Sequence, residues 1–433
     1  MTPQATFMVV APIDPVRETE LRRLLASMND SPGRVNADNA LIPFGELDTL
    51  HFARFVILDD QTLEDVRVYG LPVRTYPLYL AFLGDFDGER NEFLGKLVKR
   101  AGKGLRSIFA CCKDFADDTD LLAWMKERET PSIAAYVNWR GRTARRIREE
   151  AALQKALEEY LRSNASAVAG IGPREILSRL KQFVAAEKSA GRLTLSDDPP
   201  TPIGWSLRNA LHLILVPLLF LLALPLLIIA APIFLILLRR LEKTDAELCA
   251  RGDQAHSDAL ALAEDREVTN QFNAMASRKP GTVRLLTLLG VLATVDYAAR
   301  HLVRRGRLGR IRSIHFARWV LLDGMERGVF FSNYDGTVES YMDDFINKAG
   351  FGLNAIFCNA IGYPRTNWLV RDGCSDEQKY KNFLRRHTLP AQVWYKAYPG
   401  LTAIDLERNR RIRDGLESSW MSERETREWV ALL

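Results

Sequence analysis

Histidine, arginine and aspartate occur together in two related motifs of the chain, and these residue types can carry acid–base chemistry. The six residues are His51, Arg54, Asp87, His315, Arg318 and Asp335. A histidine exchanges protons near neutral pH, and a neighbouring arginine or aspartate orients polar groups and stabilises charge. They are therefore the candidate catalytic residues. The alternative is architectural: a buried arginine on a strand needs an acidic partner, and the aspartates that end neighbouring strands can supply one.

The two motifs belong to a longer internal repeat. Residues 50–55 return as 314–319, residues 86–88 as 334–336, and residues 101–105 as 349–353. A closing block is also shared: Pro131, Tyr136, Trp139, Gly141, Thr143 and Ala144 match Pro390, Tyr395, Tyr398, Gly400, Thr402 and Ala403. Motifs kept in one order at nearly constant offset indicate one structural unit used twice.

Each unit reads as strand, helix, strand, strand, helix, strand. The expected elements of the first unit are residues 6–11, 15–29, 50–58, 78–84, a helix running toward 109, and 133–139. Those of the second are 270–276, 283–302, 314–322, 329–333, 337–357 and 392–398. Asp87 and Asp335 are placed to cap the second helix of their units. The order is that of a ferredoxin-like βαββαβ unit. We expect an α+β fold in which two such units pack as an α+β barrel.

The repeat also sets the domain boundaries. They are a ferredoxin-like repeat at 1–141, a helical linker at 142–200, a membrane-embedded segment at 201–243, a second linker at 244–269, a ferredoxin-like repeat at 270–404 and a C-terminal helix at 405–433.

A thirty-residue stretch without formal charge, residues 209–238, separates the two units. Because about 20 apolar residues suffice to cross a bilayer, this stretch predicts contact with the lipid bilayer. Two units that pack together must lie on one side of the membrane. We therefore favour a hydrophobic hairpin that turns near Pro225 and returns, over a single span. A helix buried in a soluble core is the alternative.

Residues 283–302 offer a second membrane contact, because this apolar helix is followed by a basic segment. The basic residues are Arg300, Arg304, Arg305, Arg307, Arg310 and Arg312. An apolar helix with a basic end suits an interfacial position above anionic headgroups. A helix buried between the two units is the alternative.

Composition excludes several classes of function. The net charge of +5 over 433 residues is too small and scattered to indicate nucleic-acid binding. The five cysteines show no CxxC pattern, and no His or Cys spacing indicates a metal site. Reduced thiols and the lack of an apparent signal peptide place the soluble domains on the cytoplasmic side.

Aromatic residues near the closing strands provide surface on which a flat or lipidic ligand could stack. They are Trp319, Tyr334, Trp394, Tyr395 and Tyr398. Core packing is the alternative for each of them.

The doubled βαββαβ plan resembles the dimeric α+β barrel superfamily, which includes dye-decolourising peroxidases and chlorite dismutase-like proteins. Residues 315–319, 332–336 and 392–395 also resemble an uncharacterised family of bacterial membrane-associated proteins. The peroxidase resemblance implies haem, with a distal aspartate and arginine in a GxxDG element. This chain keeps only the Asp-Gly of that element, at Asp87-Gly88 and Asp335-Gly336.

Three functions are compatible with these observations. The first is a membrane-docked protein that binds a lipophilic small molecule, such as an accessory subunit in lipid metabolism. The second is a haem-dependent, peroxidase-like oxidoreductase acting on lipids or other hydrophobic substrates. The third is a membrane scaffold. A second copy of the chain or a membrane protein stays open as a further partner. We favour the first function, because no catalytic constellation stands out from the architectural alternative.

Overall fold

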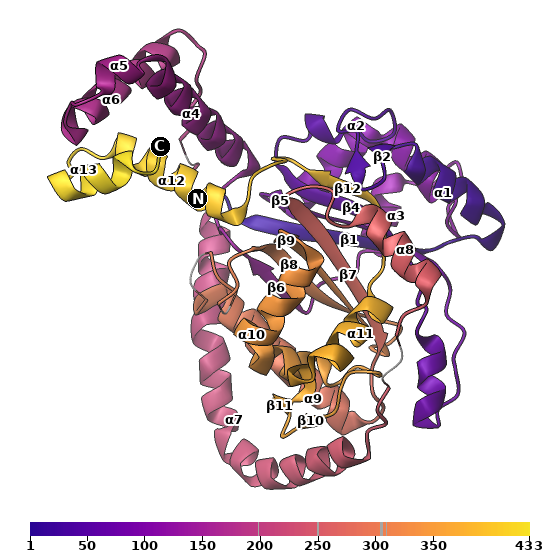
Figure 1. The fold of residues 1–433 in the computed structure, drawn as a ribbon. Coiled ribbons are helices and arrows are strands. Elements are labelled where there is room, and N and C mark those ends of the chain that lie inside the picture. Colours follow the sequence, from indigo (N-terminus) through magenta and orange to yellow (C-terminus); the bar gives the residue numbers. More distant parts are fainter. Residues whose placement is uncertain (198, 249–250, 304–305, 309) are drawn as a thin grey trace.

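The computed structural model describes residues 1–197, 199–248, 251–303, 306–308 and 310–433. It is a mixed α+β fold with two four-stranded antiparallel sheets (Figure 1). The first sheet has the order β1-β5-β4-β12, with β1 (Gln4–Pro12), β4 (Leu50–Leu58), β5 (Tyr79–Asp87) and β12 (Ala391–Lys396). The second has the order β6-β8-β9-β7, with β6 (Ala134–Val137), β7 (Thr269–Ser277), β8 (Ile314–Leu322) and β9 (Arg327–Asp335).

The closing strands are exchanged between the two units. β6 follows the first unit in sequence but pairs with β8 of the second unit, where Ala135 lies opposite Arg318. β12 follows the second unit and pairs with β4 of the first, where Trp394 lies opposite Arg54. The prediction that each closing strand completes its own unit is therefore wrong. The repeat gives both units equivalent strand edges, so the local sequence does not say which edge a closing strand joins.

Helices cover the outer face of each sheet. On the first sheet these are α1 (Glu18–Ala26), α2 (Arg90–Phe109) and α3 (Leu121–Glu127); on the second they are α9 (Thr282–His301), α10 (Val338–Phe357) and α11 (Glu377–His387). Leucines at helical spacing make this packing possible: Leu288 and Leu292 of α9 enter one core cluster with Trp319 and Phe330 of the sheet. α9 thus lies on the outside of the second sheet, and the alternative that placed it between the two units is wrong.

The inner faces of the two sheets share a third core cluster. It contains Val56 and Leu83 from the first sheet and Val320 and Phe331 from the second. Side chains fill this layer, so it is a packed core. The sheets are separate hydrogen-bonded ladders in the described part of the chain. The closed barrel stays a prediction.

A helical layer stands apart from both sheets. α4 (Ala144–Ser163) packs against α12 (Ala403–Glu417), and α6 (Pro173–Ser189) packs against α13 (Glu423–Val430) (Figure 1). The short α5 (Ala165–Val168) connects α4 to α6, and α8 (Gln254–Ala263) precedes β7. The C-terminal segment therefore packs outside the sheets, as predicted, and forms two helices.

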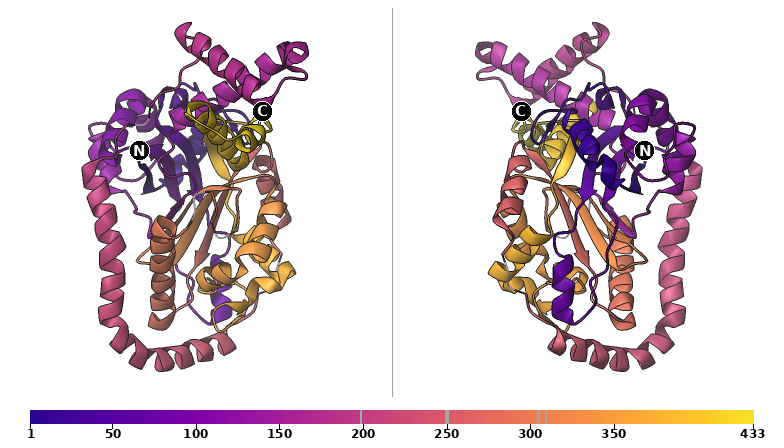
Figure 2. Two further views of the ribbon diagram at one scale, coloured as in Figure 1. Left: turned by 90° about the vertical axis from the view of Figure 1, so that its left-hand side faces the viewer. Right: turned by 90° about the vertical axis from the view of Figure 1, so that its right-hand side faces the viewer.

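The apolar segment forms one bent helix, α7 (Ile203–Thr244), of 42 residues. Figures 1 and 2 show a first arm beside the second sheet and a second arm that runs beneath it. The predicted hairpin is wrong, because the arms do not fold back on each other. Pro217, Pro225 and Pro232 lie inside the helix. Their spacings of 8 and 7 residues place successive prolines about 80° and about 20° apart around the axis. The kinks therefore add to one bend instead of ending the helix.

Both α7 and α9 are long and apolar enough to span a membrane. Most of α7 does not pack against the rest of the protein: Leu222 is 70% exposed and Ile229 is 71% exposed. Its first arm contacts α9 through His212, whose Nδ1 lies 2.9 Å from His301 Nε2. Its end is anchored through the buried Glu242. Of the basic residues after α9, Arg304 and Arg305 lie outside the described residues.

Candidate functional site

Each repeated histidine is bound to the repeated aspartate of its own unit. His51 Nε2 lies 2.9 Å from Asp87 Oδ1, and His315 Nε2 lies 2.7 Å from Asp335 Oδ1. The second oxygen of Asp87 accepts the backbone N–H of Ala144 at 2.8 Å, where α4 begins. Asp335 accepts the N–H of Ala403 at 2.7 Å, where α12 begins. A helix N-terminus favours a negative charge, so each His–Asp pair ties a central strand to the helix after a closing strand.

These contacts change the roles predicted for the two aspartates. The expectation that they cap the second helix of each unit is wrong, because Glu89 caps α2 and Thr337 caps α10. The expectation that they pair with the repeated arginines is also wrong. The carboxylates lie at the strand ends beside histidine, whereas the arginines point between the sheets.

The two His–Asp pairs differ in their third partner. Tyr398 Oη lies 3.1 Å from His51 Nδ1, and it donates a hydrogen bond when the Nε2 proton faces Asp87. Burial and the nearby Asp87 hold the pKa of Tyr398 well above its ordinary value, so the hydroxyl keeps its proton. The matching position in the other closing block is Trp139. Its indole Nε1 is buried and has no hydrogen-bond partner among the described residues.

The two histidines line one small cavity of about 220 Å³. The rings interlock across the repeat: His51 packs 5.4 Å from Phe316, and His315 packs 5.5 Å from Phe52, centroid to centroid. The remaining walls are Gln4, Asn138, Trp139, Arg142, Ile147, Tyr398 and Leu406. Burial lowers the pKa of Arg142 to about 9. The repeat in the sequence singled out His51 and His315. It did not reveal Asn138 or Arg142, because these residues beside the closing strand belong to no repeated pattern.

These residues do not fit haem. Both histidines direct Nε2 to a carboxylate, and Nδ1 of His51 faces Tyr398. Water-sized molecules can occupy only about 10 Å³ of the cavity, far less than the roughly 300–1,000 Å³ of usual ligand pockets. Axial ligation would require breaking the His–Asp pairs that connect the strands to α4 and α12.

The repeated arginines cross between the sheets. Arg318 pairs with the buried Asp85 and donates to the carbonyl of Phe7 at 2.8 Å. Arg54 donates to Asn273 Oδ1 at 2.8 Å and to the carbonyl of Ser332 at 3.1 Å. Burial lowers the pKa of Arg54 to about 9, and the charge of Arg318 adds to this shift while Asp85 opposes it. Each arginine therefore joins its own sheet to the other one.

An asymmetry in the repeat underlies this arrangement. Asp85 precedes Phe86-Asp87-Gly88, and Asn333 holds the matching position before Tyr334-Asp335-Gly336. Arg318 therefore meets a carboxylate, whereas the hydrogen bonds of Arg54 go to neutral acceptors. The alignment of the two repeats contained this signal, because only one repeat has an acidic residue there.

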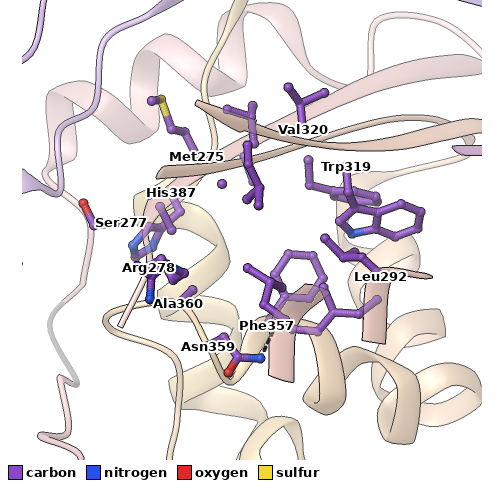
Figure 3. A pocket seen from close by; sticks show the side chains of 18 of the residues that line it. Met275, Ser277, Arg278, Leu292, Trp319, Val320, Phe357, Asn359, Ala360 and His387 are labelled. Carbon is purple, nitrogen blue, oxygen red and sulfur yellow. Dashed lines mark hydrogen bonds between the residues drawn. The ribbon is translucent and has the colours of Figure 1, made fainter. Parts of the chain in front are cut away.

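The structure does not gather the five predicted ligand-binding aromatics in one place. Tyr398 belongs to the histidine cavity. Three others stack on buried rings: Trp394 on Phe52 at 5.3 Å, Tyr395 on Phe44 at 4.9 Å and Tyr334 on Tyr341 at 4.1 Å. Trp319 is the one that lines an apolar pocket (Figure 3).

This apolar pocket lies between the second sheet and α9, α10 and α11 (Figure 3). Water-sized molecules can occupy about 60 Å³ of it, within about 540 Å³ of space between protein atoms that includes open solvent. Leu292, Trp319 and Phe357 form its walls, and small residues leave the room: Ala274, Ala276, Gly328 and Ala360. The small residues at alternate positions of β7 are the sequence signal for this pocket, and sequence reasoning missed it.

His387 and Arg278 are titratable groups in the pocket wall. Nδ1 of His387 lies 2.8 Å from the carbonyl oxygen of Phe383, to which it donates. Burial lowers the pKa of His387 to about 4, so the ring is neutral at physiological pH. The pocket therefore combines mostly apolar walls with one neutral imidazole and with Arg278, whose guanidinium donates to the backbone carbonyls of Met325 and Lys279.

The pocket lies at the end of the second sheet to which α7 is anchored. Asp245, directly after α7, binds Lys279 Nζ at 2.7 Å and an Arg284 guanidinium nitrogen at 2.6 Å. Lys279 follows β7, and Arg284 lies in the first turn of α9. Figures 1 and 2 show the second arm of α7 running past this end of the sheet.

No family model, curated protein or solved structure matches the chain.

Proposed function

We propose that the protein docks on a membrane through α7 and binds a lipophilic small molecule in the apolar pocket of the second sheet. The observation that carries this proposal is an apolar helix, exposed along most of its length, that is anchored beside the pocket. A soluble protein rarely exposes so large an apolar surface to water. Burying one such leucine or isoleucine side chain in lipid contributes about 1.5–3 kcal/mol.

The bend of α7 favours a monotopic arrangement. Contacts to the protein body occur near the start of the apolar stretch, at His212, and at its end, at Glu242. We infer that the apolar surface enters one leaflet and that all soluble elements stay on one side, which the reduced cysteines assign to the cytoplasm. We also infer that the two sheets are duplicated ferredoxin-like units in the manner of an α+β barrel, with closing strands exchanged. For a protein that docks on a membrane and binds a lipophilic molecule, we propose an accessory role in lipid metabolism.

Vesicle flotation tests the membrane contact. Leu222→Gln combined with Ile229→Gln replaces two exposed side chains that support no core, so the soluble fold should unfold at an unchanged denaturant concentration. We expect at least a tenfold weaker association with phosphatidylcholine vesicles. Val16→Gln is the matched control, because Val16 is 89% exposed but lies in the first unit. Equal binding by the double variant and wild type would refute docking through α7.

A pocket-filling substitution tests ligand binding separately. Ala276→Leu adds three carbons to the pocket wall, and Ala186→Leu adds the same atoms on the exposed face of α6. We expect only the first variant to lose co-purified lipid in native mass spectrometry. The same variant should also bind less of a fluorescent fatty acid. Vesicle association without any bound lipophilic molecule, in wild type as well, would favour the scaffold function instead.

A further inference from the structure

A polar cleft lies where α7 ends. It holds about 1,000 Å³, partly open to solvent, between the last turns of α7, the β10–β11 hairpin and the start of α11. The hairpin consists of β10 (Thr366–Asn367) and β11 (Arg371–Asp372). The polar lining that matters most is Arg239, Lys243, Arg365, Asn367, Asp372 and Lys379. Since the last apolar residue before Arg239 is Leu238, the cleft lies at the polar boundary of the membrane-contacting helix.

Some charges in the cleft are already paired within the protein. Arg239 lies 3.1 Å from Glu242, and Lys379 lies 3.3 Å from Glu247 and 3.2 Å from Asp376. The hydrogen bond to Asp376 raises the pKa of Lys379, which keeps this lysine charged within its pair. These pairs form the rim of the cleft. The other charged side chains of its lining, Lys243, Arg365 and Asp372, remain able to bind a ligand.

The remaining charges have both signs. Lys243 is exposed and forms no ion pair with a described residue. Arg365 donates to the carbonyl of Asp245 at 2.7 Å and has no carboxylate partner in the described part of the chain. The side chain of Asp372 accepts no hydrogen bond from a described residue, and neither does the buried Asn367 Oδ1. Because the Oδ1 of Asn367 is enclosed, the cleft offers two cations and one carboxylate to a ligand.

The wall that carries Asn367 and Asp372 is held by α7 itself. Glu242 accepts the backbone N–H groups of Trp368 at 3.0 Å and Leu369 at 2.6 Å. Trp368 is 48% exposed, with the Arg239 guanidinium 5.9 Å from its ring centroid. Tryptophan beside arginine at the end of an apolar helix is typical of the membrane–water interface.

We propose that this cleft binds a phosphoethanolamine headgroup. Lys243 and Arg365 donate to the phosphodiester oxygens, while Asp372 accepts from the primary ammonium. A choline headgroup has the same charges but no N–H donor, so it cannot form the charge-assisted hydrogen bond to Asp372. The acyl chains leave the cleft along the apolar surface of α7. The lipid source of this headgroup rests on the proposed membrane docking.

Vesicles of two compositions test the proposal with the full-length protein. Phosphatidylcholine vesicles and vesicles that also contain phosphatidylethanolamine are compared by flotation, and we expect several-fold stronger binding to the second kind. Glycerophosphoethanolamine and glycerophosphocholine are compared in parallel by ligand-observed NMR on protein in detergent. We expect binding of the first only, which separates headgroup recognition from effects of membrane curvature.

Two substitutions with matched controls locate the recognition. Asp372→Asn should abolish the preference for ethanolamine, and asparagine tolerates the φ of 60° at this position. Asp114→Asn, at an exposed aspartate with a φ of 59°, should retain the preference. Lys243→Gln should weaken binding to both vesicle types by about tenfold, as expected for one lost hydrogen bond to a charged phosphate. Lys99→Gln should not.

The outcomes separate the two proposals. Equal binding to both vesicle compositions by wild type, or a preference that survives Asp372→Asn, overturns the ethanolamine site and leaves membrane docking intact. Failure to bind any vesicle overturns the docking. In that case the NMR comparison still decides the cleft, because equal signals from the two soluble headgroups overturn it.

Discussion

Arg54 and Arg318 occupy the same position in the two repeats, but their removal should have different effects. Arg318 pairs with Asp85, and both side chains are buried. Arg54 is bound by the amide oxygen of Asn273 and by backbone carbonyls. We predict that Arg318→Met lowers the free energy of unfolding more than Arg54→Met does.

The magnitude follows from what each substitution leaves behind. Arg318→Met leaves the carboxylate of Asp85 in the core, where the amide of Asn333 lies at 3.4 Å and the charge of Arg54 acts on it without a hydrogen bond. Removing one partner of a buried ion pair costs about 3–5 kcal/mol. Arg54→Met leaves neutral acceptors without a donor, which costs about 1–3 kcal/mol. It also removes a buried cation whose pKa is lowered to about 9. The expected difference is about 2 kcal/mol.

Denaturant unfolding in mild detergent measures this difference, provided that the variants share one m-value. Asp85→Asn in the Arg318→Met background should recover part of the loss, because it neutralises the stranded carboxylate. His315→Ala should cost less than Arg318→Met, since Asp335 keeps its bonds from Ala403 and Thr269. Equal losses for the two arginine variants, or no recovery in the double variant, would show that Asp85 does not depend on Arg318.

Three further predictions concern other parts of the molecule. Because the folded pKa of His387 is about 4 and its ordinary value is 6.5, the unfolded chain takes up the proton first; stability should fall by about 3 kcal/mol as the pH drops from about 6.5 to about 4. His387→Gln should lack this part of the slope in unfolding curves recorded across that range. Glu242→Gln should loosen the β10–β11 hairpin and speed chymotrypsin cleavage after Trp368, whereas an unchanged cleavage rate would remove the anchoring role of Glu242. Added hemin should give no Soret shift that depends on His51 or His315, and a shift lost in their alanine variants would restore the haem hypothesis.

Local patterns in the sequence predicted the local structure well. The predicted strands 50–58 and 314–322 coincide with β4 and β8, and the predicted helix 337–357 coincides with α10 to within one residue. These elements depend on apolar alternation, helical spacing and capping residues, which act over a few positions of the chain. The uncharged length of residues 209–238 predicted an apolar segment, which the structure shows as one exposed helix instead of the expected hairpin.

The partners of the repeated polar residues depended on distances that the sequence does not contain. In each repeat the sequence offers both a histidine and an arginine as partners for Asp87 or Asp335. The strand register and the bulge of β4 and β8 place the histidine next to the aspartate. Arg54 and Arg318 instead point into the layer between the sheets, where residues of the opposite sheet are the available acceptors. The His51–His315 neighbourhood was predictable because the repeat implies a pseudo-twofold relation.

The sequence by itself determined the repeated motifs, the order of strands and helices around them, and the apolar segment between them. Tertiary structure alone decided the exchange of β6 and β12, because the repeat offers two equivalent edges and only long-range packing selects one. Tertiary structure also decided the course of α7. Each proline weakens the helix locally, but the three kinks together bend the helix without folding it back into a hairpin. Tertiary packing also decided the position of the apolar pocket, because small residues on β7 and β9 leave space beneath α9, α10 and α11.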